Sequence, residues 1–133
     1  LIEINADSQK ISMALLNILD NAVKYNVKNG EIILAVEKLI DKPYIRISVK
    51  DTGIGIDEKD AGKLFTKFFR GENAAKAIPT ASGLGLYIAQ NIIRRHGGEI
   101  KFESELNRGS VFYFTLPIDP KLIPPKEIIY GEE

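Results

Sequence analysis

The sequence predicts an α/β (α+β) two-layer sandwich, in which a mixed, mainly antiparallel β-sheet is covered on one face by three helices. Three stretches of the 133-residue chain place apolar residues at helical spacing, and four shorter stretches have the composition of strands. The strand-like stretches fall into two hairpins, with helices before and between them. This order is typical of a sheet that packs helices against one side.

The first helix is predicted from Asp7 to about Tyr25, with Asp7 or Ser8 as its N-cap. Strands are predicted over residues 31–39 and 44–50, and a proline lies in the turn between them. The apolar residues of the helix recur every three or four positions, as on one helical face; they are Ile11, Ala14, Leu15, Ile18, Leu19, Ala22 and Val23.

A second helix is predicted from Asp57, which can cap it, to about Phe69. Residues 71–82 come next. They lack any period, are rich in small residues and contain a proline, so we expect a loop that acts as a lid.

The third helix is predicted to begin after a pair of glycines and to end at His96, where two further glycines follow. Two last strands are expected at residues 99–104 and 111–116. We therefore expect one domain over residues 1–117. Residues 118–133 form a C-terminal extension, because four of the six prolines lie at or beyond its boundary.

The composition excludes several classes of function. The chain contains no cysteine and one histidine, so thiol catalysis and histidine-rich or cysteine-ligated metal sites are excluded. Its 18 basic and 18 acidic residues cancel, so we expect no nucleic-acid partner. The lack of cysteine fits a cytoplasmic compartment, and no apolar run is long enough for direct insertion into a membrane. The abrupt start suggests a fragment of a longer protein.

Three polar residues share one stripe of the first predicted helix. Asn17, Asn21 and Lys24 are spaced i, i+4 and i+7, which places them within an arc of about 60° beside the apolar face. Two amide oxygens and an ammonium would then line the rim of a groove. The alternative is an ordinary polar flank, as surface helices commonly have.

A carboxylate stands at the end of the second predicted strand. Asp51 is followed by Gly53 and Gly55. A carboxylate at a strand end can accept a hydrogen bond from an exocyclic amine, and glycines let a flat ring approach the backbone. The alternative is a strand-ending turn in which the Asp side chain bonds its own backbone.

A second glycine pair, Gly83 and Gly85, opens the third predicted helix. Glycines there let a ligand approach, and the free N–H groups of a helix N-terminus favour an anion such as a phosphate. Upstream, Phe65 and Arg70 belong to an aromatic run that ends in an arginine. Taken alone, such a run is typical of core packing beside a solvated charge.

These motifs resemble, in order and spacing, the catalytic ATP-binding domain of sensor histidine kinases. That family belongs to the superfamily of gyrase, heat-shock chaperone ATPases, histidine kinases and MutL. The resemblance covers about residues 7–117 and implies a Bergerat-type ATP-binding fold. The motifs that carry it are N-x-x-x-N-x-x-K-Y, D-x-G-x-G, F-x-x-F-F-R, the lid-like loop and S-G-L-G-L.

The resemblance implies a role for each matching residue. Asn21 is expected to ligate Mg²⁺, and Asp51 to bind the adenine amino group of ATP. Asn17 is expected to assist at the metal, and Lys24 and Arg70 to contact phosphates, so these three form the expected catalytic set. The other expected nucleotide-binding residues are Tyr25, Gly53, Gly55, Ile56, Phe65, Ser82, Gly83, Leu84, Gly85, Leu86 and Thr115.

The resemblance also implies partners. The γ-phosphoryl group of Mg-ATP would pass to a histidine on the dimerisation and phosphoacceptor hairpin of a parent kinase, which would in turn serve a response regulator. His96 is expected to be a helix cap and not this acceptor. Whether the parent kinase is membrane-anchored stays open.

Three alternatives remain within or beside this family. The chain could be an ATPase of the superfamily, a protein-serine kinase, or a nucleotide-binding module without catalysis. Superfamily ATPases usually carry a glutamate where Asn17 stands, and an amide cannot act as a general base at neutral pH. Asn17 therefore favours phosphoryl transfer over hydrolysis.

Overall fold

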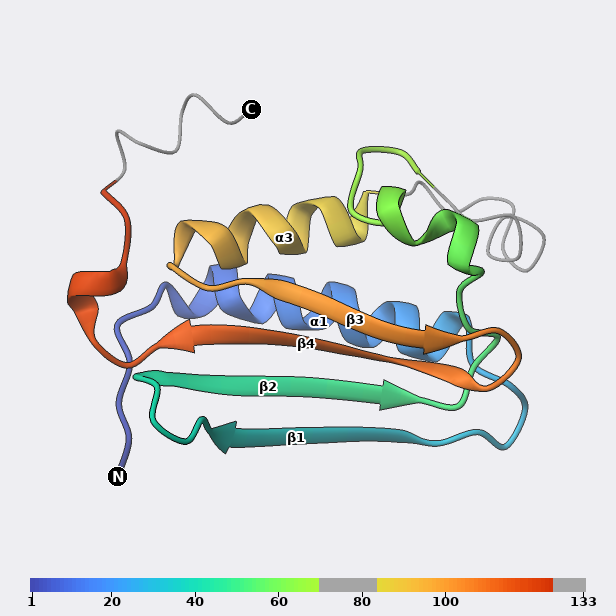
Figure 1. Cartoon of the computed structure of the whole chain (residues 1–133), viewed down its shortest axis with the longest axis horizontal. Coiled ribbons are helices and arrows are strands. Elements are labelled where there is room, and N and C mark those ends of the chain that lie inside the picture. Colours follow the sequence, from blue (N-terminus) through green and yellow to red (C-terminus); the bar gives the residue numbers. More distant parts are fainter. Residues whose placement is uncertain (70–83, 126–133) are drawn as a thin grey trace.

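A computed structural model describes residues 1–69 and 84–125 of the chain, and it has two layers (Figure 1). Within these residues, two α-helices pack side by side on one face of a four-stranded sheet. The elements in chain order are α1 (Ser8–Lys24), β1 (Ile32–Lys38), β2 (Tyr44–Asp51), the 3₁₀ helix η1 (Glu58–Lys63), α3 (Gly85–Arg95), β3 (Ile100–Glu105), β4 (Gly109–Pro117) and the 3₁₀ helix η2 (Pro120–Leu122). The predicted two-layer sandwich is confirmed.

The sheet has the strand order β1-β2-β4-β3. Its three pairings are all antiparallel, so the described sheet is antiparallel throughout and not mixed as the sequence predicts. The four predicted strands are confirmed within one or two residues at each end. Antiparallel strands need only short turns, which explains why both hairpins are visible in the sequence.

The hydrophobic core lies between the two helices and the sheet. Its members recur every fourth residue on α1 and alternate along the strands, as amphipathic elements require. The buried hydrophobic residues among those described are Ala14, Ile18, Ala22, Ile47, Val49, Ala89, Ile92, Ile93, Ile100, Phe112, Phe114 and Leu116. Within residues 1–69 and 84–125, no helix is long and apolar enough to cross a membrane.

The second predicted helix is wrong in extent. Asp57 does cap a helix, but this is the 3₁₀ segment η1, and irregular turns replace the helix from Leu64 to Phe69. Gly62 lies within η1 and weakens it, and Phe68 takes a left-handed conformation with φ of 63°. Phe65 instead packs edge-on against an aromatic pair of β3 and β4, so tertiary packing overrides helical spacing here.

His96 fastens the end of α3 to the start of α1. Asp7 is the N-cap of α1 and accepts from the backbone N–H groups of Gln9 and Lys10. The N–H of Asp7 donates to His96 Nε2 at 3.1 Å, so Nδ1 carries the proton and donates to the Ile92 carbonyl at 2.8 Å. His96 is therefore a helix cap, as expected, and in addition it links the two helices.

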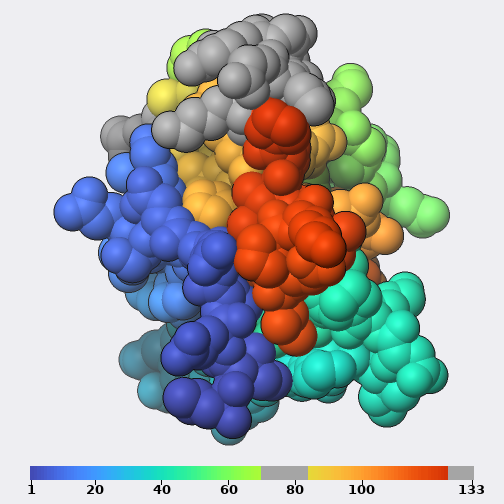
Figure 2. Space-filling view, turned by 90° about the vertical axis from the view of Figure 1, so that its left-hand side faces the viewer, coloured from blue at the N-terminus to red at the C-terminus, as the bar shows by residue number. Residues whose placement is uncertain are grey.

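The described part of the C-terminal extension packs against the domain. Figure 2 shows it in red beside the dark-blue start of the chain. The N–H of Ile118 donates to the Pro43 carbonyl at 2.8 Å. Gly97, with φ of +85°, lets the Leu122 carbonyl approach so closely that a Cβ would overlap it. Residues 118–125 thus cover the end of α3, whereas residues 126–133 lie outside the described part.

Replacing His96 by Ala is expected to lower the free energy of unfolding by about 1–2 kcal/mol, because a backbone donor and a helix-end carbonyl lose their partner. Urea unfolding measures this change. Glu103→Ala, at an exposed position of β3, is the control and is expected to stay within about 0.5 kcal/mol of the wild type. Equal effects of the two substitutions would show that the link contributes nothing.

Candidate functional site

Asp51 lies where β2 ends, at the right-hand end of Figure 1, and two backbone groups hold its carboxylate. Oδ1 accepts from the N–H of Gly53 at 2.8 Å and from the N–H of Ser110 at 3.2 Å. Both bonds use the same oxygen, and no described residue bonds Oδ2. The carboxylate is therefore fixed in orientation and keeps one oxygen for a ligand that donates a hydrogen bond.

Burial raises the pKa of Asp51 above its usual range, although the two N–H bonds oppose that change. The ionised carboxylate is thus less well stabilised in the folded protein than in water. A hydrogen-bond donor that reached Oδ2 would restore part of the lost solvation. This half-buried carboxylate has the properties of a ligand-binding group.

The glycines around Asp51 permit backbone to pack against backbone. A Cβ at Gly53 would overlap the Tyr25 carbonyl oxygen, and one at Gly55, with φ of +72°, would overlap that of Glu105. These contacts require glycine at both positions. The sequence pattern instead predicts that the glycines leave room for a flat ring. The protein's own backbone occupies the space that a side chain would need.

The turn between β3 and β4 packs against the same loop from the other side. A Cβ at Gly109, with φ of +115°, would overlap the Asp51 carbonyl oxygen. The N–H of Asn107 donates to the Ile54 carbonyl at 2.7 Å. Asn107 itself has φ of 65°, a conformation that asparagine tolerates better than most residues. The residues after Asp51 are therefore interlocked with this turn.

The start of α3 meets the amide stripe of α1. The nearest atoms to a Cβ at Gly85 are Cβ and Cγ of Asn17, at 3.8 and 3.9 Å. Neither Asn17 nor Asn21 hydrogen-bonds another described residue through its side chain. Leu84 is the N-cap of α3 and makes no side-chain cap hydrogen bond. The N-terminus of a helix favours an anion. Amide oxygens and helix N–H groups thus lie together.

Lys24 belongs to the same helix face but makes a different contact. Its Nζ lies 2.7 Å from Oδ2 of Asp20, one turn earlier. The hydrogen bond to Asp20 is the main cause that raises the pKa of Lys24. The ammonium therefore sits at the exposed surface of α1 and would have to leave Asp20 to contact a phosphate.

Tyr25 and Ile56 connect the site to the core. The Tyr25 carbonyl accepts from the N–H of Ile54 at 3.0 Å, which joins the end of α1 to the loop after β2. Ile56 and Leu86 are partly buried and pack against the core cluster. Phe65 contacts Phe102 and Phe112, at ring-centroid distances of 6.0 and 6.4 Å, so in this structure it is a packing residue.

Thr115 is not brought together with the other predicted site residues. It lies toward the end of β4 away from Ser110, and alternation along the strand places it on the face opposite the helices, across from Arg46. Its hydroxyl accepts from the N–H of Glu99. Arg70, Ser82, Gly83 and the predicted lid over residues 71–82 lie outside the described residues.

Ser110 is a site residue that the sequence motifs do not predict. It is buried, with 8% of its surface exposed, and its N–H holds Asp51. The two residues are paired across β2 and β4 although they lie far apart in the chain. No local motif signals this contact, because it depends on the strand register.

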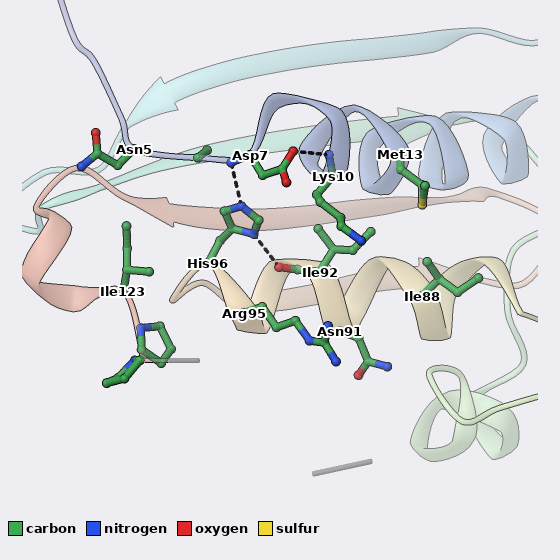
Figure 3. Close-up of a pocket in the computed structure, with 13 residues that line it drawn as sticks. Asn5, Asp7, Lys10, Met13, Ile88, Asn91, Ile92, Arg95, His96 and Ile123 are labelled. Atoms are coloured by element: carbon green, nitrogen blue, oxygen red, sulfur yellow. Dashed lines mark hydrogen bonds between the residues drawn. The ribbon is translucent and has the colours of Figure 1, made fainter. Parts of the chain in front are cut away.

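A hollow of about 810 Å³ lies at the other end of the helices (Figure 3). Its walls come from the start of α1, the end of α3 and the C-terminal extension, and they include Lys10, Met13 and Arg95. Both nitrogens of His96, which faces this hollow, are already bonded. The described residues contain no group of three or more metal-ligating histidine, cysteine or acidic side chains. The Asp51 region is therefore the candidate site.

Comparisons with known proteins place this geometry in a family. Residues 6–120 match the family model described as histidine kinase-, DNA gyrase B- and HSP90-like ATPase. The chain is 38% identical over 114 residues to sensor histidine kinase WalK of Bacillus subtilis, covering 86% of this chain and 19% of WalK. It is 36% identical over 128 residues to signal transduction histidine-protein kinase BarA of Escherichia coli, covering 94% and 14%. The chain thus spans a fifth or less of these relatives.

Solved structures agree. The mycobacterial sensor histidine kinase MprB matches with a TM-score of 0.77 at 29% identity, covering 86% of this chain and 76% of that one. The catalytic domain of histidine kinase ThkA matches with a TM-score of 0.74 at 33% identity, covering 90% and 73%. Full-length ShkA in complex with AMPPNP matches with a TM-score of 0.73 at 32% identity, covering 88% and 23%.

The raised pKa of Asp51 predicts how Asp51→Asn changes stability with pH. Below the usual Asp value of 3.8, the carboxyl is protonated in both the folded and unfolded states and the raised pKa has no effect. As pH rises above that value, the unfolded chain loses its proton first, so the wild type loses stability relative to the variant. The difference levels off above the folded pKa. Urea unfolding at a series of pH values measures it, and a difference independent of pH would contradict the assignment.

Proposed function

The chain belongs to the family of histidine kinase-, DNA gyrase B- and HSP90-like ATPases, and we propose that it is the Mg-ATP-binding catalytic domain of a sensor histidine kinase. In this proposal the domain transfers the γ-phosphoryl group of ATP to a histidine on the separate dimerisation hairpin of its parent protein. The curated relatives cited above are histidine kinases, which supports this member of the family over the others.

The single observation that carries the proposal is the carboxylate of Asp51. Two N–H groups hold Oδ1, and Oδ2 is left for a donor. The exocyclic amine of adenine is such a donor, whereas guanine presents a carbonyl oxygen at the corresponding position. A carbonyl facing an ionised carboxylate would leave both oxygens without a donor, so the site should favour ATP over GTP.

The residues present fit a magnesium–phosphate group. Asn17 and Asn21 offer amide oxygens that are not bonded to other described residues, and such oxygens suit a hard cation. One or two amide ligands cannot fill its coordination sphere, so phosphate oxygens and water would supply the rest. When bound, Mg²⁺ neutralises charge on the transferring phosphoryl group.

The chain's own groups have distinct tasks in this proposal. Asp51 orients the base, and the N–H groups at the start of α3 bind phosphate oxygens. Lys24 exchanges Asp20 for a phosphate as nucleotide binds, and Arg70 contributes a further positive charge. The asparagine side chains of the α1 stripe cannot act as general bases, so transfer to an external acceptor is favoured over hydrolysis by water.

The acceptor is proposed to lie on another part of the parent protein. His96 is unsuited to that role, because both of its ring nitrogens are hydrogen-bonded to backbone. Among the structural relatives, ThkA has been solved in complex with response regulator protein TrrA, at 32% identity and a TM-score of 0.69. We extend this to a response regulator as the downstream partner of the present chain. A cytoplasmic location is part of the same proposal.

ATP is expected to bind at least about tenfold more tightly than GTP, because guanine leaves Asp51 unpaired. Calorimetric titration of the chain with each nucleotide in the presence of Mg²⁺ measures the ratio. Asp51→Asn is expected to weaken ATP binding and to reduce the preference. The matched control Asp57→Asn, at the cap of η1, should leave both affinities unchanged. Equal affinities for ATP and GTP in the wild type would remove Asp51 from base recognition.

Asn21→Ala is expected to abolish the Mg²⁺-dependent part of ATP affinity and to stop transfer from radiolabelled ATP to the parent's acceptor hairpin supplied in trans. Adenosine, which has no phosphates, should bind the variant normally. Asn91→Ala on α3, which lines the hollow of Figure 3, is the control. Transfer at the wild-type rate by Asn21→Ala would make the α1 stripe an ordinary polar flank. Labelling of the chain without a hairpin would contradict the proposed acceptor.

A further inference from the structure

Ser104 occupies an unusual position on β3. Ile100 and Phe102 precede it on the strand face that packs toward the helices, and burial alternates along the strand accordingly. A third apolar residue would continue this row. Instead, the Ser104 hydroxyl lies 2.8 Å from the N–H of Ile56, 2.7 Å from Oγ of Ser110 and 3.1 Å from the carbonyl oxygen of Gly109.

One arrangement of protons satisfies all of these groups. The Ser104 hydroxyl donates to the Gly109 carbonyl and accepts from the Ile56 N–H and from the Ser110 hydroxyl. A serine hydroxyl has one proton and two lone pairs, so its full bonding capacity is used. Each of the three bonds ends on a segment that lies against Asp51.

The two segments are the ones that hold the Asp51 carboxylate. Gly53 donates to Oδ1 from the loop that Ile56 ends, and Ser110 donates to the same oxygen from the start of β4. Ser104 is bonded to the loop through Ile56 and to β4 through Ser110. It therefore fixes the spacing between the two N–H donors whose directions determine where Oδ2 points.

We propose that Ser104 is a positioning residue for nucleotide selection: its hydroxyl joins the loop after β2 to the start of β4 and thereby aims the carboxylate of Asp51 at the base. This inference rests on the proposed function, since it assigns the orientation of the same carboxylate. Ser104 itself does not touch the ligand. It acts through backbone groups, so its removal should alter selectivity and not only stability.

The hairpin has other interactions that would hold it without Ser104. The rings of Phe102 and Phe112 stack at a centroid distance of 5.5 Å, and Phe65 packs edge-on against both. Because this aromatic cluster stabilises β3 against β4, we expect a domain without the Ser104 hydroxyl to stay folded. The loss should then appear as altered donor geometry at Asp51.

The test compares Ser104→Ala and Ser104→Thr with the wild type, with Ser48→Ala as the control. Ser48 is also a strand serine, but it lies on the sheet face away from the helices, opposite Ala35 and Tyr113. Titration with ATP and with GTP in the presence of Mg²⁺ gives the selectivity. Ser104→Ala is expected to weaken ATP binding about tenfold while GTP affinity changes little, because loss of the three hydrogen bonds of the Ser104 hydroxyl lets the Asp51 carboxylate turn away from the base. Ser104→Thr, which keeps the hydroxyl, should retain most of the preference.

A second measurement does not need nucleotide. NMR titration of the Asp51 carboxyl reports its pKa, which burial raises and which the N–H bonds of Gly53 and Ser110 partly bring down again. Ser104→Ala should weaken those bonds and so raise the pKa further, whereas Ser104→Thr and Ser48→Ala should leave it unchanged. Thermal unfolding confirms that each variant is folded.

The outcomes separate the inference from the function it rests on. If Ser104→Ala weakens ATP and GTP equally, or leaves the Asp51 titration unchanged, Ser104 has no positioning role. If the wild type binds neither nucleotide but the Asp51 titration moves in Ser104→Ala, the proposed function is wrong and the positioning of Asp51 stands. If the Ser104→Ala protein does not fold, the Ser104→Thr variant provides the test. A folded Ser104→Thr variant that has lost the preference for ATP overturns the proposal.

Discussion

The antiparallel register of β2 and β4 sets Asp51 opposite Ser110, and the arrangement of groups around the Asp51 carboxylate depends on that pairing. The turn after Asp51 supplies one N–H donor to the carboxylate, from Gly53, and the pairing with β4 brings the second, from Ser110. The pairing also presses the β3–β4 turn against the loop after Asp51. A shift of one residue would turn every side chain of β4 to the opposite face and would expose Phe112, Phe114 and Leu116. The core therefore enforces the register that the site needs.

Much of the fold could be predicted because its signals are local. The spacing of apolar residues on α1 and the alternation in the strands report which face is buried, and both were confirmed. The extent of the second predicted helix was wrong because contacts with residues distant in the chain determine the conformation of that segment. Phe65 has helical spacing with its neighbours, but its ring packs against strands of a distant hairpin, and Phe68 takes a left-handed conformation that ends any helix.

The candidate site divides in the same way. The kinds of residues that form it were visible, since a carboxylate between a strand and two glycines is a local pattern. Its hydrogen-bond donor from β4 was not visible, because the contact joins positions distant in the chain. The face on which Thr115 lies also depends on register. The Lys24–Asp20 pair follows from a local rule, because opposite charges four residues apart on a helix are neighbours, but the family resemblance assigns Lys24 only to a phosphate.

Gly55 and Gly109 have a consequence for how the chain can vary over generations. Each lies against a carbonyl oxygen of the other's segment, so a side chain at either position would force both loops apart. Sequence changes in the two loops are therefore coupled. A substitution of either glycine, or an insertion or deletion in either loop, requires a compensating change in the other loop. The turn between β1 and β2 contains no glycine and is linked to the described C-terminal extension by one backbone bond, from the Ile118 N–H to the Pro43 carbonyl. A change in the length of that turn would therefore disturb one bond at the opposite end of the sheet and leave the two interlocked loops in place.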